Sequence, residues 1–171
     1  WMGVLLTGCM TAALLTGCGG GSQSAGDKTT LKVGVTNFAD TLEPTENYFS
    51  WVVMRYGMGE TLVKFDEKMN PTPWLAESWK ISDDKLTWTF KIRDNVKFSN
   101  GKPLTAEAVK ASLERSFAKN NRAKTFFEYT EMKADGQTLT IKTVKPSPSM
   151  PGFLADPLFL IVDVSSEGER D

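Results

Sequence analysis

Serine, aspartate and glutamate are plentiful in this chain, but cysteine and histidine, the side chains best suited to nucleophilic and acid–base chemistry near neutral pH, are not. The only two cysteines, Cys9 and Cys18, each end a copy of the stretch LLTGC. There is no histidine, so the usual general base near neutral pH and the commonest metal ligand are both missing. Neither a GxSxG nucleophile motif nor a strand followed by a glycine-rich phosphate-binding motif occurs. These residue types argue against an enzyme and against nucleotide binding, and we expect no cofactor and no protein metal site.

The amino-terminal stretch has the pattern of a secretion signal. Residues 1–26 carry no charge and include an apolar run too short and too interrupted by glycine for a good membrane span. LLTGC resembles the lipobox of bacterial lipoproteins, in which the cysteine receives a diacylglycerol and becomes the first residue after cleavage. Cys18 fits this role better than Cys9, which has little apolar chain ahead of it. We expect a lipoprotein signal peptide in residues 1–18, lipidation of Cys18 and a true start ahead of Trp1.

The rest of the chain has the composition of an ordinary soluble domain. Residues 19–30 are rich in glycine and serine and predict a flexible tether, which leaves residues 31–171 to fold. The chain has 20 Lys and Arg against 21 Asp and Glu, so no excess of positive charge favours nucleic acid. We expect one domain, or part of a larger one, with no nucleic-acid partner. The alternative for the first segment is a buried apolar stretch with an incidental thiol.

Apolar periodicity predicts a mixture of strands and helices. Alternation predicts strands at residues 31–36, 86–92 and 138–144, and the turns SDDK and ADGQ predict two hairpins. A short strand is predicted at residues 61–65, after Gly57 and Gly59. Helical spacing predicts one helix within residues 47–58 and another after Thr105, a suitable N-cap. Prolines make residues 145–157 a predicted loop, and the apolar residues 158–164 a last strand. The expected fold class is α/β, with an α+β arrangement in this part.

The stretch from Pro73 to Arg115 resembles the hallmark region of the extracytoplasmic solute-binding proteins of peptide and nickel ABC transporters. Its elements are LAESW, an acidic turn, LTWTFKIRDNVKFSNGKPLTAEAV and a helix ending SLER. The resemblance extends back through ETLVKFDE and forward through ADGQTLTI. It implies a two-lobed periplasmic-binding-protein-like fold that closes on its ligand. Residues 31–171 would then supply one incomplete lobe with its small subdomain, as an amino-terminal fragment.

The same resemblance implies a function and a location. The whole protein would capture a nickel or other metal chelate, or a short peptide, and deliver it to the permease subunits of an ABC importer. It would lie outside the cytoplasm, lipid-anchored to the cell membrane. Two stretches, residues 47–66 and 96–108, look closer to the nickel branch, and an oligopeptide or dipeptide receptor is the alternative. A lipid-anchored interaction protein or enzyme is a remoter one.

Ligand contacts in this family come chiefly from the segment before ETLVKF and from the region after the SLER helix. Carried over to this sequence, they point to Met54, Arg55, Tyr56, Arg122, Lys124 and Phe127. Arg122 and Lys124 can donate hydrogen bonds to a carboxylate, Arg in bidentate fashion, or they can be solvated loop charges. Phe126 and Phe127 can form an apolar wall or belong to the core. Met54 and Met58 can be soft metal ligands or packing residues.

The resemblance also carries an expectation about the last part of the chain. With the second lobe and the hinge outside these residues, we expect several apolar side chains to lack a packing partner and to be exposed. They are Phe153, Leu154, Leu158, Phe159 and Leu160.

Overall fold

The computed structural model describes residue 34 and residues 40–167. The chain divides into two units, Trp1–Val35 and Thr36–Asp171, and the elements below all belong to the second. The predicted signal peptide, Cys9 and Cys18, the tether and nearly all of the predicted strand at residues 31–36 lie outside the described residues.

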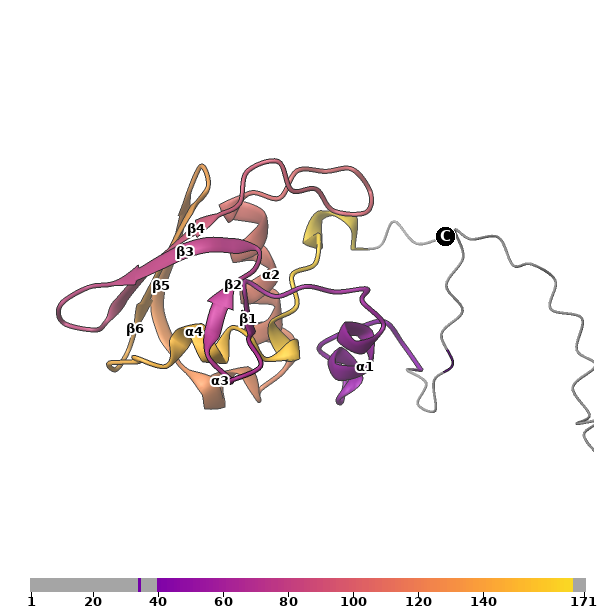
Figure 1. Cartoon of the computed structure of the whole chain (residues 1–171), viewed down its shortest axis with the longest axis horizontal. Coiled ribbons are helices and arrows are strands. Elements are labelled where there is room, and N and C mark those ends of the chain that lie inside the picture. The colour runs from indigo at the N-terminus through magenta and orange to yellow at the C-terminus, as the bar shows by residue number, and fades with distance from the viewer. Residues whose placement is uncertain (1–33, 35–39, 168–171) are drawn as a thin grey trace, which may run out of the picture. The chain divides into compact units, whose positions relative to one another are not determined.

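A four-stranded antiparallel sheet is the largest element of the second unit (Figure 1). Its strand order is β3-β4-β6-β5, with β3 (Ala76–Ile81), β4 (Thr87–Ile92), β5 (Tyr129–Asp135) and β6 (Thr138–Thr143). In the central pair, Trp88 lies opposite Ile141 and Phe90 opposite Leu139. Every second residue of β4 and β6 is buried, because alternate side chains of a strand point to the same face. Both predicted hairpins are confirmed.

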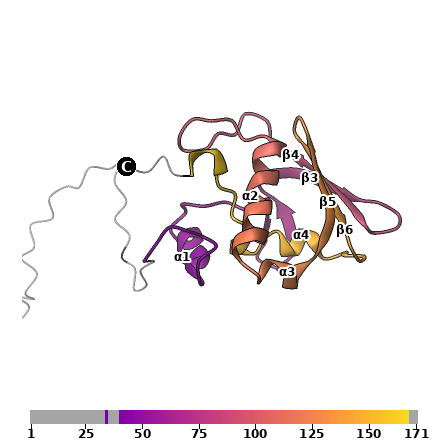
Figure 2. The ribbon, with the colours of Figure 1, turned by 180° about the vertical axis from the view of Figure 1, so that it is seen from behind.

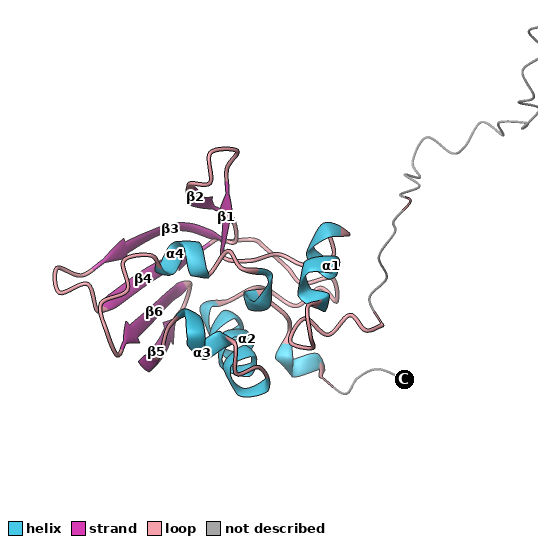
Figure 3. Cartoon of the chain, turned by 90° about the horizontal axis from the view of Figure 1, so that it is seen from below, coloured by secondary structure: helices cyan, strands magenta, loops and turns pink. Residues whose placement is uncertain are grey.

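Helix α2 (Ala106–Lys119) lies along one face of the sheet, next to β5 and β6 (Figures 2 and 3). Its start is fixed by Thr105, whose hydroxyl oxygen accepts a hydrogen bond from the Ala108 amide at 3.2 Å. Val109, Leu113 and Phe117 recur at helical spacing and are buried against the sheet. The predicted N-cap and the predicted core face of this helix are therefore confirmed.

Shorter elements surround this core. Helix α1 (Phe49–Arg55) lies within the helix predicted for residues 47–58, and the strand predicted for residues 61–65 narrows to β1 (Val63–Phe65). The remaining elements are β2 (Pro71–Pro73), which pairs with β1, helices α3 (Ala123–Phe126) and α4 (Met150–Phe153), and the 3-10 turns η1 (Pro157–Phe159) and η2 (Val164–Ser166). Across the described ranges, no helix combines the length and the apolar character that crossing a membrane requires.

Two predictions for residues 145–164 are wrong. The predicted loop contains α4, and the predicted strand at residues 158–164 does not form. Asp156 accepts a hydrogen bond from the Leu158 amide at 2.8 Å and starts η1 instead. The chain then runs beside α2, where the Ser112 hydroxyl donates to the Leu160 carbonyl at 3.3 Å and accepts from the Val162 amide at 2.9 Å. A side chain of α2 thus takes the place of a neighbouring strand.

The expectation of exposed apolar residues in this region is wrong as well. Leu154, Leu158 and Phe159 are fully buried and belong to the same core as the sheet and α2, and Leu160 is buried too. Phe153 is half-buried and packs against that core. The segment after β6 therefore completes the core of the described unit.

Candidate functional site

The side chain of Arg122 lies against two aromatic rings and one carboxylate. Its guanidinium carbon is 5.5 Å from the centroid of the Tyr48 ring and 5.5 Å from that of Phe126. Its Nη2 donates to Oδ1 of Asp156 at 3.3 Å. We call Tyr48, Arg122, Phe126 and Asp156 the Arg122 site. Cation–π contact restrains the guanidinium without using its hydrogen-bond donors.

Most of the hydrogen-bonding capacity of Arg122 is unused. A guanidinium has five N–H donors, and among the described residues only Nη2 has an acceptor. Nε is buried and has no partner. Nη1 also has none, and the side chain is 28% exposed, so this end of the group is open to solvent. A guanidinium that is held in place and still has free N–H donors is suited to bind an anionic ligand.

Asn120 fixes the backbone at this position. Its Oδ1 accepts a hydrogen bond from the Arg122 amide at 2.9 Å, and its Nδ2 donates to the Thr45 carbonyl at 2.8 Å. Asn120 is the C-cap of α2, so this bridge ties the end of α2 to the segment that leads into α1. Tyr48 directly precedes α1 as its N-cap residue, and the bridge therefore helps to place its ring beside Arg122.

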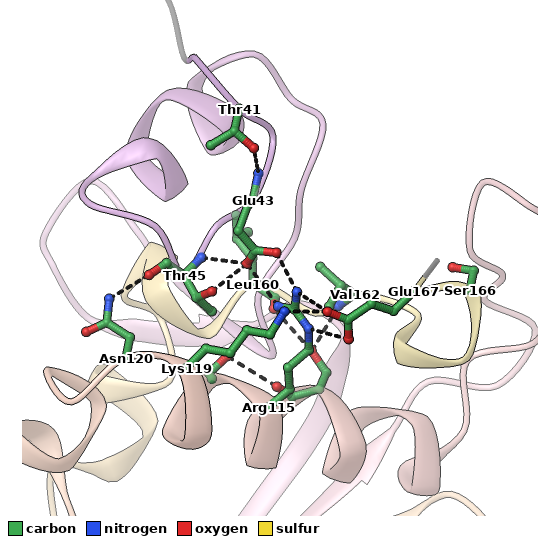
Figure 4. A network of polar contacts seen from close by, with 12 residues as sticks. Thr41, Glu43, Thr45, Arg115, Lys119, Asn120, Leu160, Val162, Ser166 and Glu167 are labelled. Carbon is green, nitrogen blue, oxygen red and sulfur yellow. Dashed lines mark hydrogen bonds and ion pairs between the residues drawn. The ribbon is translucent and has the colours of Figure 1, made fainter. Parts of the chain in front are cut away.

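A network of charged side chains holds the same segment against α2 (Figure 4). Arg115 binds both carboxylate oxygens of Glu43, with Nη1 at 2.9 Å from Oε1, and its Nε lies 3.1 Å from Oε2 of Glu167. Lys119 also contacts Glu167. We call the bidentate pair the Glu43–Arg115 clamp. It joins the chain before α1 to α2, two segments that are far apart in the sequence.

The contacts of this network shift the pKa values of Glu43, Arg115 and Glu167. The hydrogen bond from Arg115 lowers the pKa of Glu43 from 4.5 to about 2, against an opposing effect of burial. The same bond raises the pKa of Arg115 above its usual value. Hydrogen bonds from Arg115 and Lys119 lower the pKa of Glu167 to about 2. All three groups are therefore charged at neutral pH.

A groove of about 360 Å³ lies beside α3. It is lined by residues 124–128, 144–149 and Phe153. Lys124 is exposed in this groove, and Phe126 belongs both to its wall and to the Arg122 site. Phe127 also borders it but is 6% exposed and packs on Phe117, with ring centroids 5.1 Å apart, so most of its ring belongs to the core.

A larger groove, of about 620 Å³, lies beside the clamp. Its walls come mainly from residues 42–44, 57–60, 96–100, 161–164 and 166–167. Three of its carboxylates, Glu43, Asp163 and Glu167, already accept hydrogen bonds from neighbouring side chains. Within residues 40–167, no group of three or more His, Cys, Asp or Glu side chains is placed to hold a metal ion.

The six residues expected to contact a ligand fall into three places. Arg122 belongs to the Arg122 site, and Lys124 and Phe127 border the smaller groove. Met54 and Tyr56 are half-buried and Arg55 is exposed at the end of α1, and none of the three lines either groove. Met58, the other candidate soft ligand, is 53% exposed and borders the larger groove.

Tyr48 and Asp156 are members of the Arg122 site that the sequence pattern did not single out. The spacing of Tyr48 and its neighbours predicted a helix but no binding role. Asp156 lies 34 positions from Arg122, and a proline follows it, which is typical of a turn. A favourable Asp–Arg pair at such a separation has no signature in one sequence.

The sequence and the fold agree with one known family. The family described as bacterial extracellular solute-binding proteins, family 5 Middle, matches residues 70–171. This chain therefore belongs to the family 5 bacterial extracellular solute-binding proteins. The resemblance found in Pro73–Arg115 is confirmed, together with the expected mixed α/β fold class.

Individual relatives include proteins named for two kinds of ligand. The nickel-binding protein NikA of Staphylococcus aureus is 32% identical over 156 residues, which is 91% of this chain and 30% of that protein. A glutathione-binding protein, GsiB of Escherichia coli O1:K1, is 35% identical over 100 residues, 56% of this chain and 20% of that protein. A crystal structure of a nickel ABC transporter protein from Bacillus halodurans is 42% identical with a TM-score of 0.69, covering 74% of this chain and 26% of that one. The chain thus spans less than a third of each relative's length.

Proposed function

We propose that this chain is part of the substrate-binding component of an ABC importer, which captures a nickel or other metal chelate outside the cytoplasm and delivers it to the permease. The observation that carries the proposal is Arg122, whose guanidinium is fixed by Tyr48, Phe126 and Asp156 while Nη1 remains open. Arg122 binds a carboxylate of the ligand, because a fixed guanidinium pays little entropy when an anion joins it.

A metal chelate needs few ligands from the protein. The chelator supplies most of the donor atoms, so the lack of histidine in this chain does not conflict with a nickel cargo. The protein then recognises the carboxylates and apolar surface of the chelator. Met54, Arg55 and Tyr56 at the end of α1, and Lys124 and Phe127 after α2, are proposed as further contacts. No catalytic step is proposed for this chain.

A short peptide is the second candidate ligand. It also carries a carboxylate that Arg122 can bind, and the similarity to a glutathione-binding protein supports this alternative. The similarity to NikA of Staphylococcus aureus covers 91% of the chain, against 56% for that to GsiB, which favours the chelate.

The proposed location follows from the amino-terminal stretch. Cys18 receives the lipid and residues 19–30 form the tether, so the folded part is held at the outer side of the cell membrane. This places the receptor where its permease can be reached.

A melting screen of the full-length gene product tests the proposed function. A ligand at 100 times its Kd stabilises the folded state by about 2.7 kcal/mol. We expect such an increase with Ni(II) and L-histidine together, and little with Ni(II) alone. Glutathione and trialanine test the peptide alternative. If no chelate and no peptide shifts the midpoint, the receptor function is wrong.

A further inference from the structure

We propose that Asp156 is the second ligand-binding group of the Arg122 site, and that the Arg122–Asp156 pair selects ligands with an amine N–H next to a carboxylate. This inference rests on the proposed function, and it defines the chemical class of the ligand. Such a head group occurs in free α-amino acids and in metal chelates made from them.

Only part of the hydrogen-bonding capacity of the Arg122–Asp156 pair is used within the protein. Oδ1 of Asp156 accepts two hydrogen bonds, from the Leu158 amide at 2.8 Å and from Nη2 of Arg122 at 3.3 Å. Oδ2 has no partner among residues 40–167, and it is not enclosed, since the buried unpartnered polar atoms of this part of the chain are Ser50 Oγ and Arg122 Nε. Oδ2 of Asp156 and Nη1 of Arg122 are therefore both open, on two side chains that are hydrogen-bonded to each other.

The two open atoms match an α-amino acid head group. Nη1 of Arg122 can donate to the ligand carboxylate, while Oδ2 of Asp156 can accept from the neighbouring amine. The two protein groups are already in contact, so they fit a ligand whose donor and acceptor are also adjacent. A ligand with carboxylates alone would meet the charge of Asp156, whose side chain is 15% exposed, without a hydrogen bond to offset the repulsion.

Asp156 is well placed to keep its position during binding. Its bond to the Leu158 amide starts η1, whose residues are buried in the core. Arg122 is restrained independently by the rings of Tyr48 and Phe126. Asp156→Asn can keep the bond to the Leu158 amide and the side-chain volume while it removes the charge, which makes it a conservative test.

The experiment measures affinities of the full-length protein by titration calorimetry with paired probes. For a chelate receptor, the pair is Ni(II)–L-histidine, which has amine N–H groups, and Ni(II)–EDTA, whose tertiary amines have none. For a peptide receptor, it is glutathione, whose γ-glutamyl end carries an amine next to a carboxylate, and glutaryl-cysteinyl-glycine, the same peptide without that amine. Asp135→Asn, at the exposed end of β5, is the control for the loss of one negative charge.

We expect Asp156→Asn to weaken the N–H-bearing probe about tenfold or more, the effect of one charge-assisted hydrogen bond, and to leave the second probe unchanged or bound more tightly. An equal loss for both probes would show a purely structural role and overturn the inference. If the variant does not fold, the wild-type protein decides: equal affinity for glutathione and glutaryl-cysteinyl-glycine, or for both nickel chelates, overturns it. Absence of binding by any probe would instead overturn the proposed function itself.

Discussion

The Glu43–Arg115 clamp should make a measurable and pH-dependent contribution to stability. We consider Glu43→Gln, which removes the charge that Arg115 binds but keeps a side chain of the same length. Arg115 retains Glu167 in this variant, so no fully unpaired cation is created. The clamp holds the segment that carries Tyr48, so its loss should also loosen the Arg122 site.

The pKa of Glu43 sets the size of the effect. Lowering this pKa from 4.5 to about 2 corresponds to at most about 3 kcal/mol of stability. Water still reaches part of the carboxylate and screens the pair, so we expect about 1–2 kcal/mol. Because folding lowers the pKa, the contribution is fully present above about pH 4.5 and is lost as the pH falls toward 2.

Urea unfolding followed by circular dichroism, repeated at several pH values, measures this difference. Glu43→Gln should be less stable than the wild-type chain at pH 7, and the gap should close between about pH 4.5 and 2. Glu131→Gln is the matched control, because its pair with Lys133 at 2.8 Å is exposed and should contribute little. A gap that stays constant with pH, or is no larger than that of the control, would refute the role of the clamp.

Three further outcomes are expected. Trp88 is 5% exposed and its Nε1 donates to the Ser147 carbonyl at 2.9 Å, so Trp88→Ala should lower the free energy of unfolding in urea by about 3–5 kcal/mol. Trp74→Ala, at a 37% exposed position, is the control. A loss of stability no larger than that of the control would contradict the burial of Trp88. Thr105→Ala should cost about 1 kcal/mol through loss of the N-cap of α2, and an unchanged midpoint would place the helix start elsewhere. Cys18→Ser should release the full-length protein from membranes, and mass spectrometry that finds acyl chains on Cys9, or on neither cysteine, would disprove that assignment.

Local periodicity was enough to predict the hairpins and α2. The alternation around Phe90 and the spacing of Val109 and Leu113 depend only on which face of an element meets the core. A few consecutive residues are enough to show that face. The segment 158–164 is apolar enough for a strand, but a strand needs a partner. Its partner is the hydroxyl of Ser112, about fifty positions earlier, and no local pattern records that pairing.

The Arg122 site was predictable only in part. Arg122 itself was found through the family resemblance, since its neighbours in the sequence carry no periodic signal. Tyr48 and Asp156 reach it by tertiary contacts across 74 and 34 positions of the chain. Likewise, the clamp joins residues 72 positions apart. Contacts of this kind follow from how the elements pack and cannot be read from one sequence.

The central claim is that Arg122 binds the ligand carboxylate, and calorimetric titration of the full-length protein with Ni(II)–L-histidine tests it most directly. We predict micromolar or tighter binding by the wild type and at least about tenfold weaker binding by Arg122→Gln, the cost of losing one charged hydrogen-bonding pair. Arg93→Gln, which removes an exposed arginine after β4, should bind like the wild type. Equal affinities of the wild type and Arg122→Gln would contradict the claim.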